Sequence, residues 1–413
     1  MMIQRQRLPG KTSRPALWLL TAGCLLSMLL LIPVANAAQF KGEIKVGVPL
    51  PLTGRHAPFG EIIKNSFVLA AEEVNAKGGV RGGYKLELLF EDSRSDVQAA
   101  RTVTEKLINQ DKVVMLTGQY SSVETFPMTQ MVQQYGIPFL VSTAAADQIT
   151  QQGWKYIFRM VQPASEFDNG LKDFFEKVAK PKSMAILYEN TLFGTSTAAA
   201  MKEWAVKNRV EVVMYDPYDA GSPDYRPLLL RVKERKAEVI YMVSYLLDAV
   251  LLMRQAKEVD LNPQAFAGAA AGFSILPFIK GAGEVAEHVL SSTMWEPSVP
   301  YPGAMQYYKD YEKRFGSQPS YHGSQGYAAV FVVADVLNRT ASLKPDDIVA
   351  ALSKTDMMTM YGRIRFESYD KFQNQTKLPT FVIQVQKGKF VTVWPKDVAT
   401  ASALFPTPPW SKR

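Results

Sequence analysis

One segment of the 413-residue chain decides its fold: residues 113–150 read VVMLTGQYSSVETFPMTQMVQQYGIPFLVSTAAADQIT. An apolar run at 113–117 meets a turn rich in Gly and Ser, and a helical pattern then extends to Tyr135. Gly136-Ile137-Pro138 breaks that pattern, and a second apolar run at 139–142 ends in Thr and three Ala. The segment therefore predicts strand, loop, helix, strand, loop and helix in succession.

The same alternation of strand and helix patterns runs through the rest of the chain. Strand patterns occur at 44–49, 85–91, 183–188, 210–215, 238–244 and 264–268, and a terminal hairpin is expected at 379–385 and 389–394. Helix patterns occur at 61–77, 96–109, 196–208, 225–235, 246–259, 307–315, 326–339 and 345–353. This order predicts an α/β fold in which parallel sheets are covered by helices.

Two sets of strand–helix units predict two lobes. The chain is expected to pass between them at 159–165, 293–302 and 361–376, which makes three hinge crossovers. Lobe 1 is then 38–161 with 296–376, and lobe 2 is 162–295 with 377–400. The Pro-rich tail at 401–413 is expected on the surface without regular structure.

The first 37 residues have the pattern of a secretory signal peptide. An apolar run at 16–34 is followed by Ala35-Asn36-Ala37, an A-x-A cleavage site, so we expect cleavage before Ala38 and an exported protein. The run is also nearly long enough to stay in a bilayer as an anchor, and a lipid anchor on Cys24 is a further alternative. The basic residues before the run are Arg5, Arg7, Lys11 and Arg14.

Charge and cysteine content exclude several classes of function. The formal charge of +8 falls to +4 without the leader, so no strong case for nucleic-acid binding remains. Cys24 is the only cysteine, which leaves the exported part without disulfides, thiol chemistry or a cysteine metal site. Such a chain must depend on a large core, and about 376 residues suffice for two domains.

Polar and small residues follow the two strands of the opening segment. Ser121 and Ser122 begin a helix, and Thr143-Ala144-Ala145-Ala146 follow the next strand. Ligands bind beyond the carboxyl ends of strands in open α/β sheets, and a helix N-terminus offers free N–H groups to an anion. The segment therefore predicts half of a site for a small carboxylate, although N-capping and tight packing explain the same residues.

No catalytic or metal-binding pattern stands beside this site. His56, His288 and His322 are far apart, so structural or surface roles are expected for them. The chain has no G-x-S-x-G elbow and no strand-to-helix G-x-G-x-x-G fingerprint. Phe59, Phe193 and Tyr245 each follow an apolar strand, where aromatic rings suit an apolar or aromatic ligand. We expect a binding protein without cofactor or metal.

These residues carry a family resemblance over nearly all of residues 42–394. The chain resembles the periplasmic solute-binding proteins of the branched-chain amino acid ABC-transporter type, which have the two-lobed type I periplasmic-binding-protein fold. Besides 113–150, the stretches that carry the resemblance are IKVGVPLPLTGRHAPFG (44–60), EEVNAKGGVRGGYKLELLFEDSRSD (72–96), LYENTLFGTS (187–196) and LLMRQAKEVDL (251–261).

The resemblance assigns roles to individual positions. Ser122 falls where the family's serine takes the ligand carboxylate, flanked by Tyr120 and Ser121. Ala144 falls where a carbonyl meets the ligand ammonium, and Ala145 replaces a threonine beside Thr143. Phe59, Phe193 and Tyr245 fall at aromatic positions that cover the ligand. Ala270 stands where the family's ammonium-binding glutamate is expected. Asp248 and Glu189 are candidate substitutes for it, although neither matches that position.

The loss of that glutamate makes the amino end of the pocket less polar. A buried ammonium without a counter-charge is costly, so a carboxylate without an amino group fits these residues about as well as an amino acid. The resemblance implies a monomeric receptor that closes by hinge bending on a small carboxylate and delivers it to an inner-membrane ABC permease with its ATPase. A periplasmic sensor and an exported α/β enzyme are the alternatives.

Overall fold

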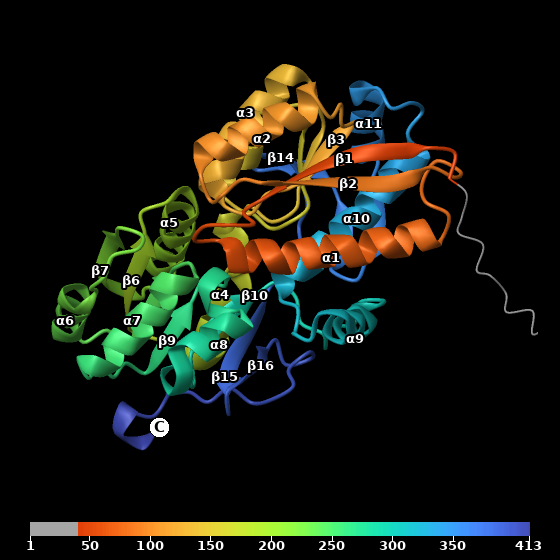
Figure 1. Cartoon of the computed structure of the whole chain (residues 1–413). Helices are drawn as coiled ribbons and strands as arrows, with labels where there is room; N and C mark the ends of the chain where they lie inside the picture. Colours follow the sequence, from red (N-terminus) through yellow and green to blue (C-terminus); the bar gives the residue numbers. More distant parts are fainter. Residues whose placement is uncertain (1–39) are drawn as a thin grey trace, which may run out of the picture. The chain divides into compact units, whose positions relative to one another are not determined.

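Two seven-stranded sheets form the framework of the chain (Figure 1). A computed structural model describes residues 40–413, and the expected signal peptide with Cys24 and the cleavage site before Ala38 lies outside them. The described residues form one compact unit that holds both sheets. We call the sheet that contains the opening segment, with its helices, lobe 1, and the other sheet with its helices lobe 2.

The lobe 1 sheet has the strand order β13-β14-β5-β4-β3-β1-β2, and all neighbours are parallel except β13 and β14. Its strands are β1 (Glu43–Leu50), β2 (Lys85–Asp92), β3 (Met115–Gly118), β4 (Phe139–Val141), β5 (Ile157–Arg159), β13 (Glu367–Tyr369) and β14 (Phe372–Gln375). A separate hairpin consists of β11 (Asp356–Thr359) and β12 (Gly362–Arg365).

Helices cover both faces of this sheet. Helices α2 and α3 lie on one face, and α1 and α10 lie side by side on the other (Figure 1). The lobe 1 helices are α1 (Ala57–Ala76), α2 (Val97–Asn109), α3 (Ser122–Tyr135), α9 (Ala304–Phe315), α10 (Tyr321–Arg339) and α11 (Pro345–Leu352). Because both faces are covered, the central strands are mostly apolar, as in residues 46–50 of β1 and in β3 and β4.

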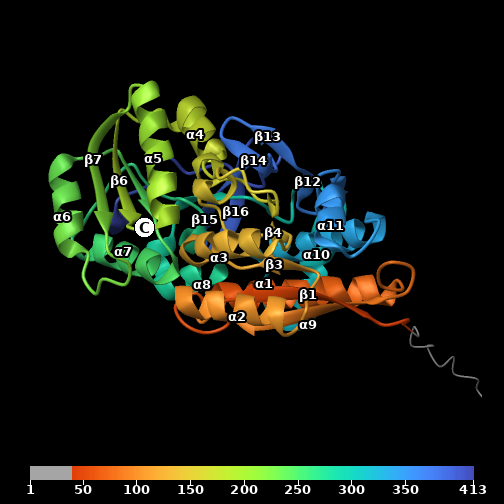
Figure 2. The same ribbon diagram turned by 90° about the horizontal axis from the view of Figure 1, so that it is seen from above.

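The lobe 2 sheet has the order β16-β15-β10-β9-β8-β6-β7, with parallel strands from β10 to β7 and an antiparallel edge of β15 and β16. Its strands are β6 (Ser183–Glu189), β7 (Glu211–Tyr218), β8 (Val239–Val243), β9 (Ala265–Gly268), β10 (Leu290–Thr293), β15 (Phe381–Gln386) and β16 (Lys389–Trp394). Helices α4 and α5 lie on one side, and α6, α7 and α8 on the other (Figure 2).

The helices of lobe 2 are α4 (Asn169–Phe174), which continues as a π turn at Phe175–Ala179, α5 (Leu192–Lys207), α6 (Arg226–Arg235), α7 (Leu246–Glu258) and α8 (Leu276–Ala282). The expected type I fold with flanked, mostly parallel sheets is confirmed. Among the helices of residues 40–413, none is long and apolar enough to cross a membrane.

Three passages join the sheets: one after β5, one after β10, and a short one at 376–380 between β14 and β15. The expectation that 361–376 forms the third passage is wrong, because β12, β13 and β14 occupy most of that range. These strands are short and polar, so they carry no strong alternation. The domain boundaries expected from the sequence stay predictions.

Two further expectations need correction. The helix expected after 142 is only a 3₁₀ turn, Asp147–Thr150, because Arg159 Nη1 donates to the carbonyl oxygens of Ala145 and Ala146, which a helix would use for its own N–H groups. The tail has some regular structure: Trp410–Lys412 forms a 3₁₀ turn, and Trp410 Nε1 donates to the Leu261 carbonyl at 2.7 Å.

Candidate functional site

A pocket lies between the strand ends of the two lobes. Lobe 1 supplies the loops after β3 and β4 and the start of α10, and lobe 2 supplies the first turns of α5 and α7 and the turn after β9. The side chains that line it are Tyr120, Ser122, Thr143, Ala145, Phe167, Phe193, Tyr245, Ala271, Tyr321 and His322. The pocket is therefore shared by both lobes, at the carboxyl ends of their parallel strands.

Ser122 is the polar centre of the lobe 1 side. It is the first residue of α3, so the free N–H groups and the positive dipole end of a 14-residue helix lie beside it. The N–H groups of Ala145 and Ala146 donate to Ser122 Oγ at 3.3 and 3.0 Å. A serine hydroxyl has two acceptor positions and one proton. With both acceptor positions in use, the proton is left to donate to a carboxylate.

Arg159 supports the loop that holds Ser122. Its guanidinium is fully buried and donates to the carbonyl oxygens of Ala145 and Ala146 at 2.8 and 2.7 Å, and to Thr150 Oγ1 at 2.8 Å. Burial lowers the pKa of Arg159 to about 10, so it is charged at neutral pH. Within residues 40–413 no carboxylate lies in ion-pair distance of it. Asp147 and Glu166 act on its charge at longer range, and its direct role is to hold the backbone of Ala145 and Ala146 in place.

Aromatic rings make up much of the wall. Phe59 stacks on Tyr120, with ring centroids 4.4 Å apart and planes 14° apart. His322 lies edge-on to both rings, at 5.0 and 5.2 Å, and Tyr245 lies 5.7 Å from Tyr120 across the cleft. Burial lowers the pKa of His322 to about 3, so its imidazole is neutral. The Tyr120 hydroxyl is buried without a hydrogen-bond partner among the described residues.

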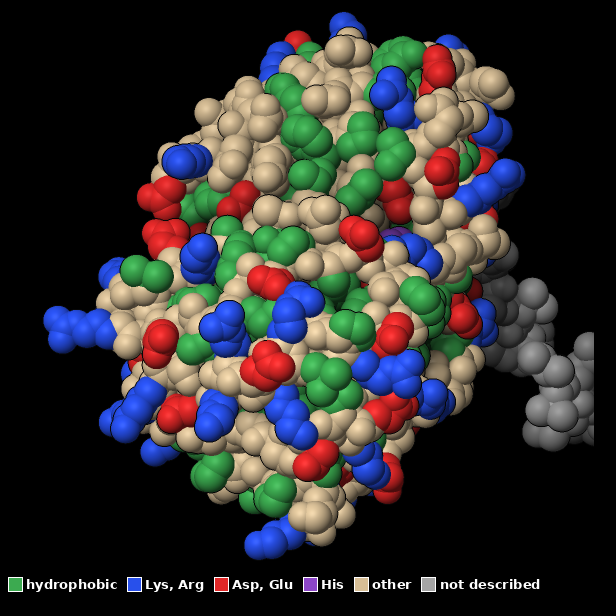
Figure 3. All heavy atoms as spheres, turned by 90° about the vertical axis from the view of Figure 1, so that its left-hand side faces the viewer, with side chains coloured by type: hydrophobic (Ala, Val, Ile, Leu, Met, Phe, Trp, Pro, Cys, Tyr) green, Lys and Arg blue, Asp and Glu red, His purple; other side chains and the backbone are tan. Residues whose placement is uncertain are grey.

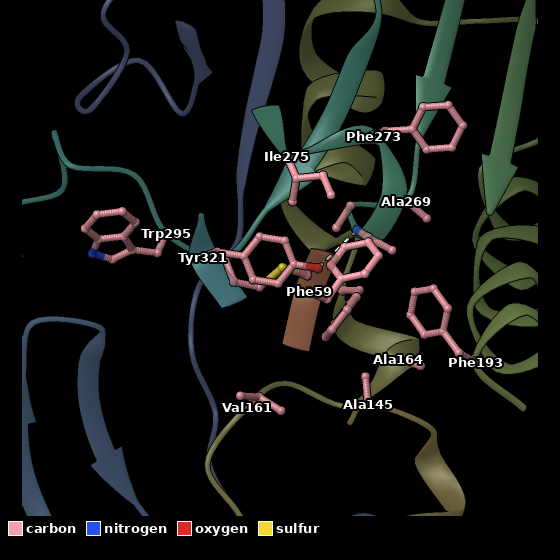
Figure 4. Packing of buried hydrophobic residues seen from close by; sticks show 14 of the residues in the cluster. Phe59, Ala145, Val161, Ala164, Phe193, Ala269, Phe273, Ile275, Trp295 and Tyr321 are labelled. Carbon is pink, nitrogen blue, oxygen red and sulfur yellow. Dashed lines mark hydrogen bonds between the residues drawn. The ribbon is translucent and has the colours of Figure 1, made fainter. Parts of the chain in front are cut away.

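The lobe 2 side contains the strained turn that follows β9. Ala270 and Ala271 have φ of +48° and +41°, a region that costs a residue with a Cβ about 1–2 kcal/mol. The turn directs the Ala271 N–H across the cleft to Tyr321 Oη at 3.0 Å, the contact drawn as a dashed line in Figure 4. Position 272 of this turn requires glycine, because a Cβ there would lie 2.5 Å from the Tyr245 carbonyl carbon.

The structure brings together six of the ten residues expected from sequence: Tyr120, Ser122, Thr143, Ala145, Phe193 and Tyr245 line the pocket. Phe59 stands behind Tyr120, and Ser121 is the buried residue before α3. Ala144 packs in a separate apolar cluster of lobe 1, and Ala270 lies beside the lining residue Ala271.

Four lining residues were missed: Phe167, Ala271, Tyr321 and His322. Tyr321 and His322 open α10, which begins five residues before the expected start at 326. His322 was expected to be structural or at the surface, and the structure places it in the pocket, next to Phe59. Ser320 precedes them as the N-terminal flanking residue of α10, and such a serine is the signal that could have found this helix start.

The pocket contains no charged side chain. Among the described residues that line it there is no Asp, Glu, Lys or Arg. Its volume is about 20 Å³, which is room for about one water molecule. Tyr321 separates it from a hollow of about 620 Å³ that Trp295, Tyr308 and Phe390 also line. A ligand of amino-acid size therefore requires the rings or the lobes to move.

Glu189 and Asp248, the acids considered as substitutes for the missing glutamate, do not line the pocket. Both are buried behind Tyr245, and both contact Arg55 of lobe 1. Burial and, after it, the neighbouring Asp248 raise the pKa of Glu189 well above its usual range. These acids therefore already have a cationic partner.

A sequence model of the periplasmic binding protein family matches residues 43–389. The chain belongs to this family. The family has a solute-binding fold and is not an enzyme family, and its name places its members in the periplasm. No group of three or more His, Cys, Asp or Glu side chains that could hold a metal ion occurs in the part of the chain that the structure describes.

Relatives and solved structures agree with this assignment. A Leu/Ile/Val-binding protein homolog 8 from Brucella melitensis is 30% identical over 403 residues, covering 94% of this chain and 98% of the relative. The substrate-binding protein LivJ from Streptococcus pneumoniae, in complex with isoleucine, has a TM-score of 0.77 at 22% identity, covering 84% of this chain and 97% of that one. A solute-binding protein from R. palustris, in complex with benzoate, has a TM-score of 0.76 at 19% identity, covering 88% and 98%.

On the face of this periplasmic binding protein shown in Figure 3, Lys and Arg alternate with Asp and Glu. No large area of one charge sign occurs on that face. Exposed ion pairs of lobe 2 include Arg231 with Asp216 and Lys257 with Glu284. The face shown therefore presents no basic patch of the kind that binds nucleic acid.

Proposed function

We propose that this protein is the extracytoplasmic receptor of an ABC importer and that its ligand is a small aromatic or aliphatic carboxylate without an ammonium group. One observation carries the ligand class: the pocket pairs the Ser122 hydroxyl and the N-terminus of α3 with a lobe 2 wall that has no acid. A carboxylate has donors there, whereas an ammonium has no counter-charge.

The binding mechanism follows from where the lining residues lie. Lobe 1 holds the carboxylate through Ser122, and lobe 2 then closes over the ligand with Phe193 and Tyr245 by hinge bending at the three passages. Closure excludes water and strengthens the polar contacts. The small volume of the pocket fits a cleft that must open before a ligand enters. The ligand stabilises the closed state only by its higher affinity for that state.

The remaining parts of the proposal concern the cell. The signal peptide is cleaved before Ala38, and the receptor acts in the periplasm as a monomer. Its partners are an inner-membrane permease and the ATPase of that permease. The benzoate complex of the R. palustris protein supports an acid without an amino group, and the Leu/Ile/Val-binding name of the Brucella relative supports the carboxylate end alone.

A thermal-shift screen tests the proposal. Matched pairs differ only in the amino group: leucine against 4-methylpentanoate, and phenylalanine against 3-phenylpropanoate, with benzoate added. Binding raises the melting temperature by mass action. We expect the acids to raise it and the amino acids to leave it unchanged. A strong rise with leucine or phenylalanine and none with the acids would contradict the proposed ligand class.

A further inference from the structure

Arg55 connects the two lobes at the rim of the pocket. It lies in the loop between β1 and α1 of lobe 1, and its Nη2 is 3.1 Å from Asp248 Oδ2 and 3.4 Å from Glu189 Oε1 of lobe 2. Glu189 ends β6, and Asp248 lies in the first turn of α7. We call these three residues the Arg55 bridge.

The three residues of the Arg55 bridge are buried to different degrees. Glu189 and Asp248 are 1% and 2% exposed, whereas the Arg55 side chain is 32% exposed. Both acids are also fixed within lobe 2: Glu189 Oε1 accepts the Tyr245 N–H at 3.0 Å, and Asp248 Oδ1 accepts the Gly221 N–H at 3.0 Å. The carboxylates therefore belong to lobe 2 in any state, and Arg55 is the member that arrives from the other lobe.

The bridge also reaches the wall of the pocket. Glu189 holds the backbone of Tyr245, and the Arg55 guanidinium lies 5.9 Å from the centre of the Tyr245 ring. His56, next to Arg55, packs edge-on against the same ring at 4.5 Å. Tyr245 is thus held from lobe 2 by Glu189 and from lobe 1 by Arg55 and His56.

We infer that Arg55 is a positioning residue for ligand binding: it neutralises the buried acids of lobe 2 when the lobes close, and thereby holds Tyr245 over the ligand. Opening the cleft withdraws Arg55 and leaves two carboxylates close together without a cation, which disfavours the open state unless water or a proton replaces it. This inference deepens the proposed function, because it supplies the contact that favours closure whatever acid is bound.

Single-molecule fluorescence energy transfer can measure closure without any ligand. The chain from Ala38 onward has no native cysteine, so Arg101→Cys in α2 and Lys207→Cys in α5, both exposed, give one dye position in each lobe. We expect Arg55→Ala to shift the ratio of closed to open molecules toward open by about tenfold, since the ion pairs of Arg55 with Glu189 and Asp248 are only partly exposed to solvent. Arg55→Lys should restore part of the closed population.

Two controls separate positioning from a general loss of structure. Arg94→Ala removes an exposed arginine of lobe 1 that makes no ion pair among the described residues, and it should leave the ratio unchanged. Glu189→Gln keeps an acceptor for the Tyr245 N–H and removes one of the two acids that Arg55 contacts, so it should shift the ratio toward open less than Arg55→Ala does. An unchanged ratio in Arg55→Ala, or an equal shift in Arg94→Ala, would overturn the inference.

The test of the Arg55 bridge does not depend on the proposed ligand class. The closed fraction is measured in the absence of ligand, so it tests the Arg55 bridge even if 4-methylpentanoate and 3-phenylpropanoate do not bind. If they do bind, Arg55→Ala should lower the affinity for both by the same factor of about ten, because closure is common to all ligands. Unequal losses would mean that Arg55 contacts the ligand directly and would contradict the positioning role.

Discussion

The two sides of the pocket differ in chemistry although they belong to lobes of the same design. Lobe 1 presents the Ser122 hydroxyl, the N-terminus of α3 and, behind them, the buried charge of Arg159. Lobe 2 presents Phe193, Tyr245 and the Ala271 turn, without an acid. The proposed ligand follows from this contrast: its anionic end is assigned to lobe 1, and lobe 2 provides an apolar cover for the other end.

The largest effect on ligand affinity is expected when an acid is placed on lobe 2, because this removes the difference in charge preference between the two sides of the pocket. Ala270→Glu introduces a buried carboxylate beside the bound anion, so we expect the affinity for 3-phenylpropanoate to fall at least about 100-fold, or about 3 kcal/mol. Isothermal titration calorimetry measures this loss. Ala270→Gln has nearly the same volume without the charge, and it should lose much less. Equal losses in both variants would assign the effect to size and not to charge.

On lobe 1 the next largest effect is expected at Ser122. Ser122→Ala removes the hydroxyl proton that we assign to the carboxylate, which should cost about 1–3 kcal/mol of binding free energy, measured by calorimetry. Ser142→Ala is the matched control, because its buried hydroxyl has no partner among residues 40–413 and lies outside the pocket lining. An unchanged affinity in Ser122→Ala would remove Ser122 from the site.

A smaller effect should show that lobe 2 contributes apolar cover. Phe193→Leu keeps an apolar side chain but removes the ring, so 3-phenylpropanoate should lose about 0.5–1.5 kcal/mol of aromatic contact. The affinity for 4-methylpentanoate should change less. If both ligands lost equally in competition titrations, Phe193 would act through packing of the lobe and not through contact with an aromatic ligand.

The smallest effect is expected on stability and not on binding. Burial raises the pKa of Glu124, in the first turn of α3, to about 7 from 4.5. A raised pKa stabilises the folded state fully below 4.5, and this contribution is lost as the pH rises through 7. Scanning calorimetry should therefore show Glu124→Gln gaining roughly 2–4 °C in melting temperature relative to wild type between pH 5 and 8. A constant difference would contradict the burial of an ionisable Glu124.

The lobe 1 half of the site could be predicted because it is local in sequence. Tyr120, Ser122, Thr143 and Ala145 follow two apolar runs with clear Gly and Pro boundaries, and strand ends of a parallel sheet meet at one edge. The fold class could be predicted from the alternation of strand and helix patterns along the chain. The missed helix break at 143–150 depends on Arg159, a contact that only the folded chain forms.

The rest of the pocket depends on contacts between distant segments. Tyr321 and His322 lie in the first turn of α10, where the amphipathic pattern has not begun, and the passage after β10 brings this helix back to lobe 1. Phe167 follows the first passage between the lobes. No local pattern marks these residues, because their closeness to Ser122 is created by the crossovers.

The central claim, that lobe 1 binds an anion and lobe 2 has no place for a cation, is tested most directly by one pair of titrations. Calorimetry on the wild-type protein should compare 3-phenylpropanoate with phenylalanine, which differ only in the amino group. We predict that 3-phenylpropanoate binds at least about 100-fold more tightly, the cost of an ammonium left without a counter-charge. Equal or tighter binding of phenylalanine would contradict the account.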